Sequence, residues 1–184
     1  MAAGLAGKKE SMEKRKKLSK SELIKRAKKI KLLLTDCDGV LTDNGVYYGK
    51  DGEELKRFSI RDGMGVKRLI NLVNVETGII SGENTAPVKA RAKKLEMKEI
   101  HLGIKDKPKT LAEIMKKRKL KAEEIAFIGD DTIDVEVMKT VGLAACPIDA
   151  TKFALKVADY VTENRGGFGA FRDFAEFIIE AKLK

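Results

Sequence analysis

The sequence contains no tryptophan, one histidine and only two cysteines among its 184 residues. Cys37 and Cys146 lie in separate apolar segments and form no CxxC pair, which argues against a disulfide framework and against a cysteine zinc site. We expect both cysteines to be small residues of the core. His101, the single histidine, is expected at the end of a strand, and we assign it no role as a ligand.

Long apolar runs are also absent. No stretch approaches the roughly 20 apolar residues that span a bilayer, and the Lys-rich N-terminus has no apolar core of a signal peptide. We therefore expect a cytoplasmic protein without a membrane span. Apolar residues make up 43% of the chain, which is enough for the core of one ordinary domain.

Positive charge is concentrated at one end of the chain. The net charge is +10, yet residues 1–31 hold 12 Lys and Arg against three Asp and Glu, so the remainder is nearly neutral. We expect residues 1–29 to be a basic extension, partly disordered, with a short helix that Ser19 or Ser21 caps. Residues 30–184 are the expected folded domain. The extension fits a solvated leader or an RNA or membrane tether, but it lacks interleaved aromatic residues, and nucleic acid is not the partner we expect.

After residue 30, strand patterns alternate with helix patterns. Apolar strands that are each followed by an amphipathic helix are typical of a doubly wound α/β fold with a parallel sheet. The expected strands are 32–35, 76–80, 99–102, 125–129, 143–146 and 159–161, and the expected helices are 62–71, 85–95, 107–118, 132–141, 151–157 and one from residue 170. The one insertion is a β-hairpin after the first strand, with strands 46–48 and 54–59 around a Gly-Lys-Asp-Gly turn.

Polar residues follow four of these strands at the point where each strand ends. They are Asp36 and Asp38, Ser81 and Gly82, Lys107 shortly after the third strand, and the pair Asp130 and Asp131 followed by Asp134. In a parallel sheet these ends face one crevice. Carboxylates in one crevice repel one another unless a cation neutralises them, and Mg2+ prefers hard oxygen ligands together with phosphate. With a hydroxyl, a backbone N–H and a lysine for an anion, the crevice is suited to phosphoryl transfer.

Each of these residues also has a purely structural interpretation. The Asp-Gly pair at 38–39 is common in turns, and the Asp pair at 130–131 could cap the helix expected from residue 132. The Ser-Gly pair at 81–82 could form only a strand-to-helix turn, and Lys107 could be one of many solvated lysines. Their occurrence together, in this order, favours the chemical interpretation.

The order of these motifs resembles the haloacid dehalogenase superfamily. Its four motifs are matched, in order, by residues 36–42, Ser81, Lys107 and residues 129–134. Within the superfamily, the hairpin, the lack of a cap domain and segments 61–65 and 164–172 are similar to small sugar-acid phosphatases typified by 3-deoxy-D-manno-octulosonate 8-phosphate phosphatase. The resemblance covers residues 31–182 and implies a Rossmann-like, capless domain that acts in sugar-acid and lipopolysaccharide biosynthesis.

The resemblance implies a Mg2+-dependent phosphomonoesterase that works through an aspartyl-phosphate. Asp36 would be the nucleophile. Asp38 would protonate the leaving group and then take a proton from water. The carboxylates of Asp36 and Asp130, with the backbone carbonyl of Asp38, would bind the metal.

Other residues of the motifs would support this chemistry. Asp131 and Asp134 would hold metal-bound waters and Lys107 in place. Ser81 and Lys107 would stabilise charge on the oxygens of the transferring phosphoryl group.

The resemblance further implies a 2-keto-3-deoxy sugar acid with a terminal phosphate as the substrate. The residues expected to contact it are Gly82, Glu83, Arg61, Lys94 and Thr42. Glu83 and Lys94 resemble phosphatases of the nine-carbon 2-keto-3-deoxynononate 9-phosphate, whereas Arg61 resembles the octulosonate type, so both substrates stay open. An arginine at position 83 would pair with a substrate carboxylate, which Glu83 cannot do. A phosphatase of another small phosphorylated metabolite also fits.

Capless members of this family are similar in forming homotetramers in which each hairpin reaches over a neighbour's crevice. Tyr47, Tyr48 and Lys56 could therefore contact a neighbouring subunit's substrate, and a role in an edge strand is an equal alternative.

A non-enzymatic phosphoacceptor domain is the alternative from another functional class. Such receiver domains also place acidic residues, a hydroxyl and a lysine on a parallel sheet, but their lysine comes last in the chain. Here Lys107 precedes Asp130 and Asp131, and Asp38 supplies an acid/base group that receivers lack.

Overall fold

The structure, a computed structural model, describes residues 17–184. Its centre is a parallel sheet of six strands in the order β5-β4-β1-β6-β7-β8. The strands are β1 (Leu32–Thr35), β4 (Glu76–Ile80), β5 (Glu99–His101), β6 (Ile125–Ile128), β7 (Leu143–Cys146) and β8 (Tyr160–Val161). The chain proceeds from β1 first to one edge of the sheet and then to the other, so the topological switch point, where such sheets bind ligands, lies at β1.

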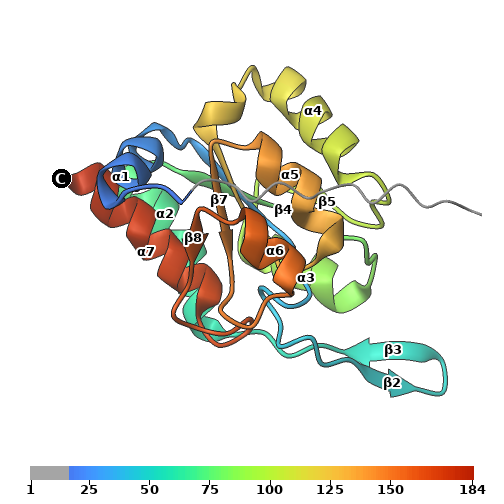
Figure 1. The fold of residues 1–184 in the computed structure, drawn as a ribbon. Helices are drawn as coiled ribbons and strands as arrows, with labels where there is room; N and C mark the ends of the chain where they lie inside the picture. The colour runs from blue at the N-terminus through green and yellow to red at the C-terminus, as the bar shows by residue number, and fades with distance from the viewer. Residues whose placement is uncertain (1–16) are drawn as a thin grey trace, which may run out of the picture.

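Helices cover both faces of this sheet (Figure 1). One face carries α1 (Lys20–Lys29), α2 (Ile60–Val73), α3 (Ala86–Lys94) and α7 (Ala170–Leu183), and the other carries α4 (Lys107–Arg118), α5 (Val135–Thr140) and α6 (Lys152–Val157). Two short 3-10 helices, η1 (Ala122–Glu124) and η2 (Thr132–Asp134), precede β6 and α5. Side chains of a strand alternate between faces, and accordingly Leu33 packs with the first group of helices while Leu32 and Leu34 pack with the second. The predicted doubly wound α/β sheet is confirmed.

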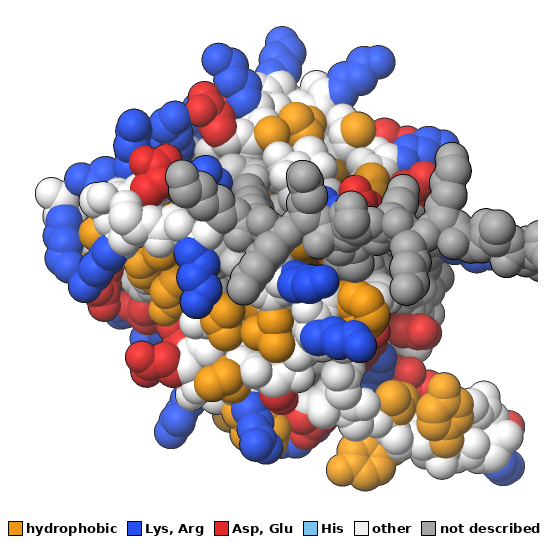
Figure 2. Space-filling view, viewed as in Figure 1, with side chains coloured by type: hydrophobic (Ala, Val, Ile, Leu, Met, Phe, Trp, Pro, Cys, Tyr) orange, Lys and Arg blue, Asp and Glu red, His pale blue; other side chains and the backbone are white. Residues whose placement is uncertain are grey.

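A hairpin is the insertion between β1 and α2. Its strands are β2 (Tyr47–Gly49) and β3 (Gly52–Leu55), and it projects from the body of the molecule with hydrophobic side chains on its surface (Figures 1 and 2). The insertion contains no cap domain, as expected. The predicted extent of the second strand, to residue 59, is wrong. The second strand starts earlier, at Gly52, which pairs with Gly49, and it ends at Leu55, which pairs with Tyr47, the first residue of β2. The residues that follow turn back toward the loop after β1.

The described part of the basic N-terminal segment is attached to the domain. Ser19 caps α1 as expected, since its hydroxyl accepts a 3.2 Å hydrogen bond from the N–H of Glu22. Ala27 and Ile30 are buried in the same apolar cluster as α7. Residues 1–16 of the expected extension lie outside the described residues. Among the described residues, no helix is both long and apolar enough to cross a bilayer.

The cysteines and the histidine occupy the expected positions. Cys37 and Cys146 are buried and free, and burial raises the pKa of the Cys146 thiol to about 12. Both are therefore core residues that stay protonated at neutral pH. His101 is the last residue of β5, where its Nε2 lies 2.9 Å from Oε2 of Glu99.

Candidate active site

The first residue of the site continues β1, the strand at the switch point. The backbone N–H of Asp36 donates to the carbonyl oxygen of Ile128 on β6 at 2.9 Å. The Asp36 side chain is buried, and its Oδ1 accepts a 2.6 Å hydrogen bond from the N–H of Cys37. The sheet therefore holds a carboxylate at its carboxyl edge, away from bulk water.

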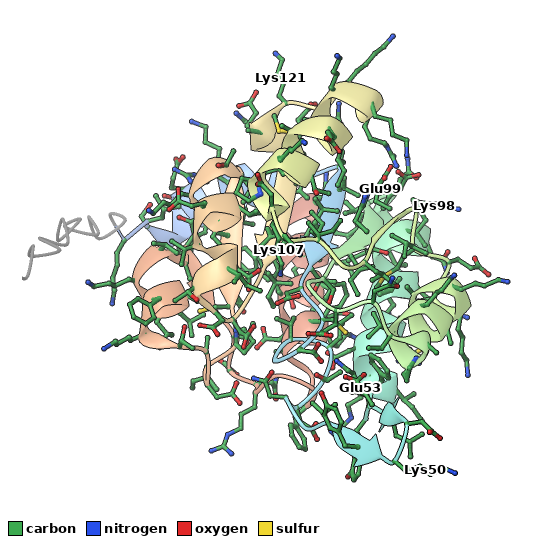
Figure 3. All side chains as sticks on the ribbon, turned by 90° about the vertical axis from the view of Figure 1, so that its right-hand side faces the viewer. Lys50, Glu53, Lys98, Glu99, Lys107 and Lys121 are labelled. Carbon is green, nitrogen blue, oxygen red and sulfur yellow. The ribbon has the colours of Figure 1, made fainter. Side chains whose placement is uncertain are left out.

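Lys107 is the cation that contacts Asp36. It is the first residue of α4, and its side chain is only 2% exposed, with Nζ 2.9 Å from Oδ1 of Asp36 and 2.7 Å from Oδ1 of Asp134. Figure 3 shows it near the middle of the molecule, while the other labelled lysines lie at the periphery. Burial lowers the pKa of Lys107, but the charges of Asp36 and Asp134 raise it by more. The pKa of Lys107 is therefore above its ordinary value. Lys107 is thus a buried, charged residue, and its interpretation as a solvated lysine is wrong.

The three acidic residues after β6 have different environments. Asp134 is fully buried, and its Oδ2 accepts hydrogen bonds from the N–H groups of Asp130 at 3.0 Å and Asp131 at 3.3 Å. These bonds hold a tight turn, so the single helix expected here begins as the 3-10 helix η2 and continues as α5. Asp131 is exposed, and its carboxylate accepts the N–H of Thr132 at 2.6 Å. Asp131 therefore has the capping role that we considered for it.

Three buried carboxylates share the space beside Lys107. Oxygens of Asp36, Asp130 and Asp134 lie within 4.8 Å of one another. Burial, and next the charge of Asp134, raise the pKa of Asp36 to about 8 against the lowering effect of Lys107. Burial and Asp134 likewise raise the pKa of Asp130 to about 7. One lysine does not balance three carboxylates, and a divalent cation with oxygen ligands fits the remaining negative charge.

Asp38 lies in the turn that packs against this cluster. Gly39 has a φ of +80°, and a Cβ atom at this position would overlap Oδ2 of Asp130, so only glycine lets the turn approach so closely. The Asp38 carboxylate accepts hydrogen bonds from Oγ1 of Thr42 at 3.0 Å and from Nζ of Lys56 at 2.6 Å. Thr42, expected to contact substrate, is buried and donates to Asp38. Lys56 contacts Asp38 of its own chain. The backbone carbonyl of Asp38 stays a predicted metal ligand.

Ser81 lies at the same edge of the sheet. Thr35 of β1 is level with Ile79 of β4, so Asp36 and Ser81 follow neighbouring strands at the same edge of the sheet. Ser81 is buried, and its Oγ accepts the N–H of Glu83 at 3.1 Å. Gly82 and Glu83 are exposed beside it. The structure thus brings this predicted motif to the carboxyl edge of the sheet, where it forms a turn, and its role at the phosphate stays a prediction.

The other two residues expected to contact substrate lie elsewhere in the chain. Lys94 is the exposed last residue of α3. It lies about 12 Å along the helix axis from the first residue of α3, whereas Glu83 precedes that helix, so the two residues are apart within one chain. Arg61 is exposed in the first turn of α2 and lines a surface groove of about 290 Å³ together with Phe168 and Arg172. The lining of this groove includes none of the three buried carboxylates.

Two supports of the site were not predicted. Asn44, with a φ of +63°, places its Nδ2 3.4 Å from Oδ2 of Asp130. Gly166 packs so closely on the turn after β1 that a Cβ atom there would overlap the carbonyl oxygen of Gly39, and its N–H donates to Oδ1 of Asp149 at 3.0 Å. The sequence signal for Asn44 was its place in an Asp-Asn-Gly turn, where asparagine tolerates a left-handed backbone. The pairing of distant glycines has no signal in a single sequence.

The chain is similar to known proteins over most of its length. Residues 89–167 match the family model of haloacid dehalogenase-like hydrolases. The 3-deoxy-D-manno-octulosonate 8-phosphate phosphatase of Yersinia pestis is 39% identical over 163 residues, which cover 89% of this chain and 87% of that protein.

Solved structures agree with this relationship. A probable YrbI family phosphatase from Pseudomonas syringae superposes with a TM-score of 0.85 at 41% identity, covering 88% of this chain and 92% of that one. The 3-deoxy-D-manno-octulosonate 8-phosphate phosphatase of Moraxella catarrhalis, solved in complex with magnesium, phosphate and KDO, superposes with a TM-score of 0.86 at 33% identity, covering 90% and 94%. The chain therefore belongs to the haloacid dehalogenase superfamily, within the capless family of 3-deoxy-D-manno-octulosonate 8-phosphate phosphatases.

Proposed function

We propose that this protein is a Mg2+-dependent phosphatase that hydrolyses the terminal phosphate of 3-deoxy-D-manno-octulosonate 8-phosphate. The observation that carries the proposal is the buried group in which Lys107 bridges Asp36 and Asp134 beside Asp130. This group offers a nucleophile, a fixed positive charge and oxygen ligands for a divalent cation at one crevice. The choice of sugar acid rests on the relatives, which are named as phosphatases of 3-deoxy-D-manno-octulosonate 8-phosphate.

Asp36 is the proposed nucleophile. Its carboxylate attacks phosphorus, the bond from phosphorus to the sugar oxygen breaks, and an aspartyl-phosphate forms that water then hydrolyses. Lys107, 2.9 Å from Oδ1 of Asp36, favours the ionised carboxylate and stabilises charge on the phosphoryl oxygens. Asp36, Asp130 and the carbonyl of Asp38 would hold Mg2+, with Asp134 or Asp131 fixing its waters. When bound, the ion supplies positive charge that lowers the pKa of these acids and binds phosphate oxygens.

Proton transfer is the proposed task of Asp38. In the first step it donates a proton to the leaving sugar oxygen, and in the second it takes a proton from the water that attacks the aspartyl-phosphate. The turn that carries Asp38 packs on Asp130 through Gly39, which supports a place beside the reacting phosphate. Ser81 would contribute its hydroxyl, and Gly82 its N–H, to the phosphoryl oxygens.

The eight-carbon acid is favoured because the relatives are named for it. We propose that Glu83, Arg61 and Lys94 influence the choice of sugar acid, Arg61 and Lys94 by contacting the substrate of a neighbouring subunit. The test compares kcat/KM for the eight-carbon and nine-carbon acid phosphates in the wild type and in Glu83→Arg. We expect the eight-carbon substrate to be preferred and the variant to change the ratio. A preference for the nine-carbon substrate would contradict the carbon count, and an unchanged ratio would exclude Glu83 from substrate selection.

A homotetramer is the proposed assembly, with each hairpin placed over a neighbour's crevice. The hairpin supports this because it exposes the apolar side chains of Val46, Tyr47, Tyr48 and Leu55. In the single chain, Tyr47 is 61% exposed and Tyr48 is 76% exposed. Exposed apolar residues that gather on one projection are typical of an interface. Light scattering should give a tetramer for the wild type and smaller species for a Tyr47→Ser, Tyr48→Ser double variant. A monomeric wild type would contradict the assembly.

Metal dependence distinguishes this proposal from a phosphoacceptor domain. We expect rapid release of inorganic phosphate from 3-deoxy-D-manno-octulosonate 8-phosphate with Mg2+, loss of turnover after chelation with EDTA, and recovery when Mg2+ is added back. A protein that becomes phosphorylated on Asp36 and holds the phosphate without turnover would instead be a receiver domain.

A further inference from the structure

The segment that leaves the hairpin contains a buried lysine. The side chain of Lys56 is only 1% exposed, although Leu55 before it is 62% exposed and the side chain of Arg57 after it is 45% exposed. Lysine is almost never buried without a partner, because a charge loses its hydration there. The burial of Lys56 therefore points to a specific contact.

That contact is the carboxylate of Asp38. Nζ of Lys56 lies 2.6 Å from Oδ2 of Asp38 and 3.5 Å from Oε1 of Glu53, a buried oxygen without a hydrogen-bond partner among the described residues. Figure 3 shows Glu53 on the side of the hairpin that is turned toward the body, and Lys50 at the tip. A lysine amine is ordinarily protonated at neutral pH, and the Asp38 carboxylate at this distance favours the charged form. Lys56 is therefore an ammonium ion.

The two oxygens of Asp38 have partners of different kinds. Oδ2 is bound by Lys56, and Oδ1 accepts a 3.0 Å hydrogen bond from Oγ1 of Thr42. An ammonium group has three donors and no acceptor, whereas a hydroxyl can donate or accept. A proton on Oδ2 would point at the ammonium group of Lys56, which cannot accept a hydrogen bond. A proton on Oδ1 can be donated to Oγ1 of Thr42, because the Thr42 hydroxyl can rotate and accept it.

We propose that Lys56 is a positioning residue for Asp38, which fixes Oδ2 as an acceptor and confines the transferred proton to Oδ1. This inference rests on the proposed phosphatase reaction. It gives the exit of the hairpin a role in the crevice of its own chain, separate from any contact that the hairpin tip makes with a neighbour. Without Lys56 the carboxyl group can rotate, and protonation of the leaving group becomes less efficient.

The test uses two substrates that lack the sugar acid and differ in leaving group. p-Nitrophenolate leaves readily without a proton, whereas phenolate, whose conjugate acid has a pKa of about 10 like tyrosine, gains from a proton donor. The quantity measured is the ratio of kcat/KM for phenyl phosphate to kcat/KM for p-nitrophenyl phosphate, because kcat/KM reports the step in which the leaving group departs. General acid catalysis contributes about 10²–10⁴-fold, so we expect Lys56→Met to lower this ratio at least about tenfold.

Two further variants separate positioning from other roles. Lys56→Arg keeps a donor-only cation and should restore part of the ratio. Arg57→Met is the matched control: it removes a neighbouring cation that contacts Asp43 and the carbonyl of Gly167, and it should leave the ratio unchanged. If Lys56→Met does not fold, Lys56→Gln is used, since its amide can accept as well as donate and should also lower the ratio.

The other outcomes overturn the inference. Equal losses on both substrates would make Lys56 a merely structural residue, and a loss confined to the sugar-acid phosphate would make it a substrate contact. In either case the proposed function stands if the wild type, with Mg2+, hydrolyses the sugar-acid phosphate, phenyl phosphate and p-nitrophenyl phosphate. A wild type that hydrolyses none of them would overturn the proposed function, and the inference with it.

Discussion

Asp130→Asn should stabilise the metal-free protein at pH 8 and abolish its stabilisation by Mg2+. Burial and the charge of Asp134 raise the pKa of Asp130 from 3.8 to about 7, so the folded protein keeps a proton on this carboxyl that the unfolded chain loses near pH 4. The folded state binds more protons between these values, and stability therefore falls as the pH rises from about 4 to about 7. The asparagine keeps an oxygen for Asn44 but carries no charge.

The magnitude follows from the pKa. Each pKa unit corresponds to about 1.4 kcal/mol, so ionisation of Asp130 costs the metal-free fold up to about 4 kcal/mol at pH 8. For a chain of this size, 1 kcal/mol changes Tm by about 2–4 °C. We expect the variant to melt at least about 4 °C above the wild type at pH 8 and at nearly the same temperature as the wild type at pH 4.

Thermal unfolding followed by circular dichroism in EDTA at pH 4, 6 and 8 measures this difference, and the same melts with Mg2+ measure the effect of the ion. Mg2+ at 100 times its Kd should stabilise the wild type by about 2.7 kcal/mol and the variant much less. For the melts in EDTA, Asp131→Asn is the matched control, because Asp131 is exposed and asparagine also caps. A variant that gains no stability at pH 8, or that Mg2+ stabilises as much as the wild type, would refute the reasoning.

Two other substitutions test the packing around the site. Lys107→Met leaves Asp36 and Asp134 buried without their cation, and urea unfolding without metal at pH 8 should show a loss of about 3–5 kcal/mol; a loss below about 1 kcal/mol would mean that the pairs contribute little. Gly166→Ala places a Cβ atom against the carbonyl of Gly39, so the turn that carries Asp38 must shift, and kcat should fall at least about tenfold with the fold retained; unchanged kcat would mean that this contact does not position the turn.

The sheet and the cluster of acids could be predicted from the sequence because both depend on local patterns. Apolar strands that end in Asp36, Ser81 and Asp130, and a helix that begins at Lys107, must bring those residues to one edge once the strands are parallel. The fold therefore followed from the alternation of strands and helices, and the crevice followed from the fold.

The environment of Asp38 could not be predicted in the same way. Its partner Lys56 is 18 residues away, beyond a hairpin whose second strand ends earlier than its sequence suggests. The approach of Gly166 to Gly39 joins segments separated by most of the chain. Such contacts depend on the direction in which a loop leaves a strand, and hydrophobic periodicity carries no information about that direction.

The central claim is that Asp36 attacks the phosphate of a sugar acid in this crevice. Its most direct test is the rate of phosphate release from 3-deoxy-D-manno-octulosonate 8-phosphate with Mg2+ by the wild type and by Asp36→Asn, with circular dichroism to show that both are folded. We expect turnover by the wild type and a loss of about a thousandfold or more in the variant, since nothing else in the described site replaces the nucleophile. A folded Asp36→Asn protein that retains substantial activity would contradict this claim.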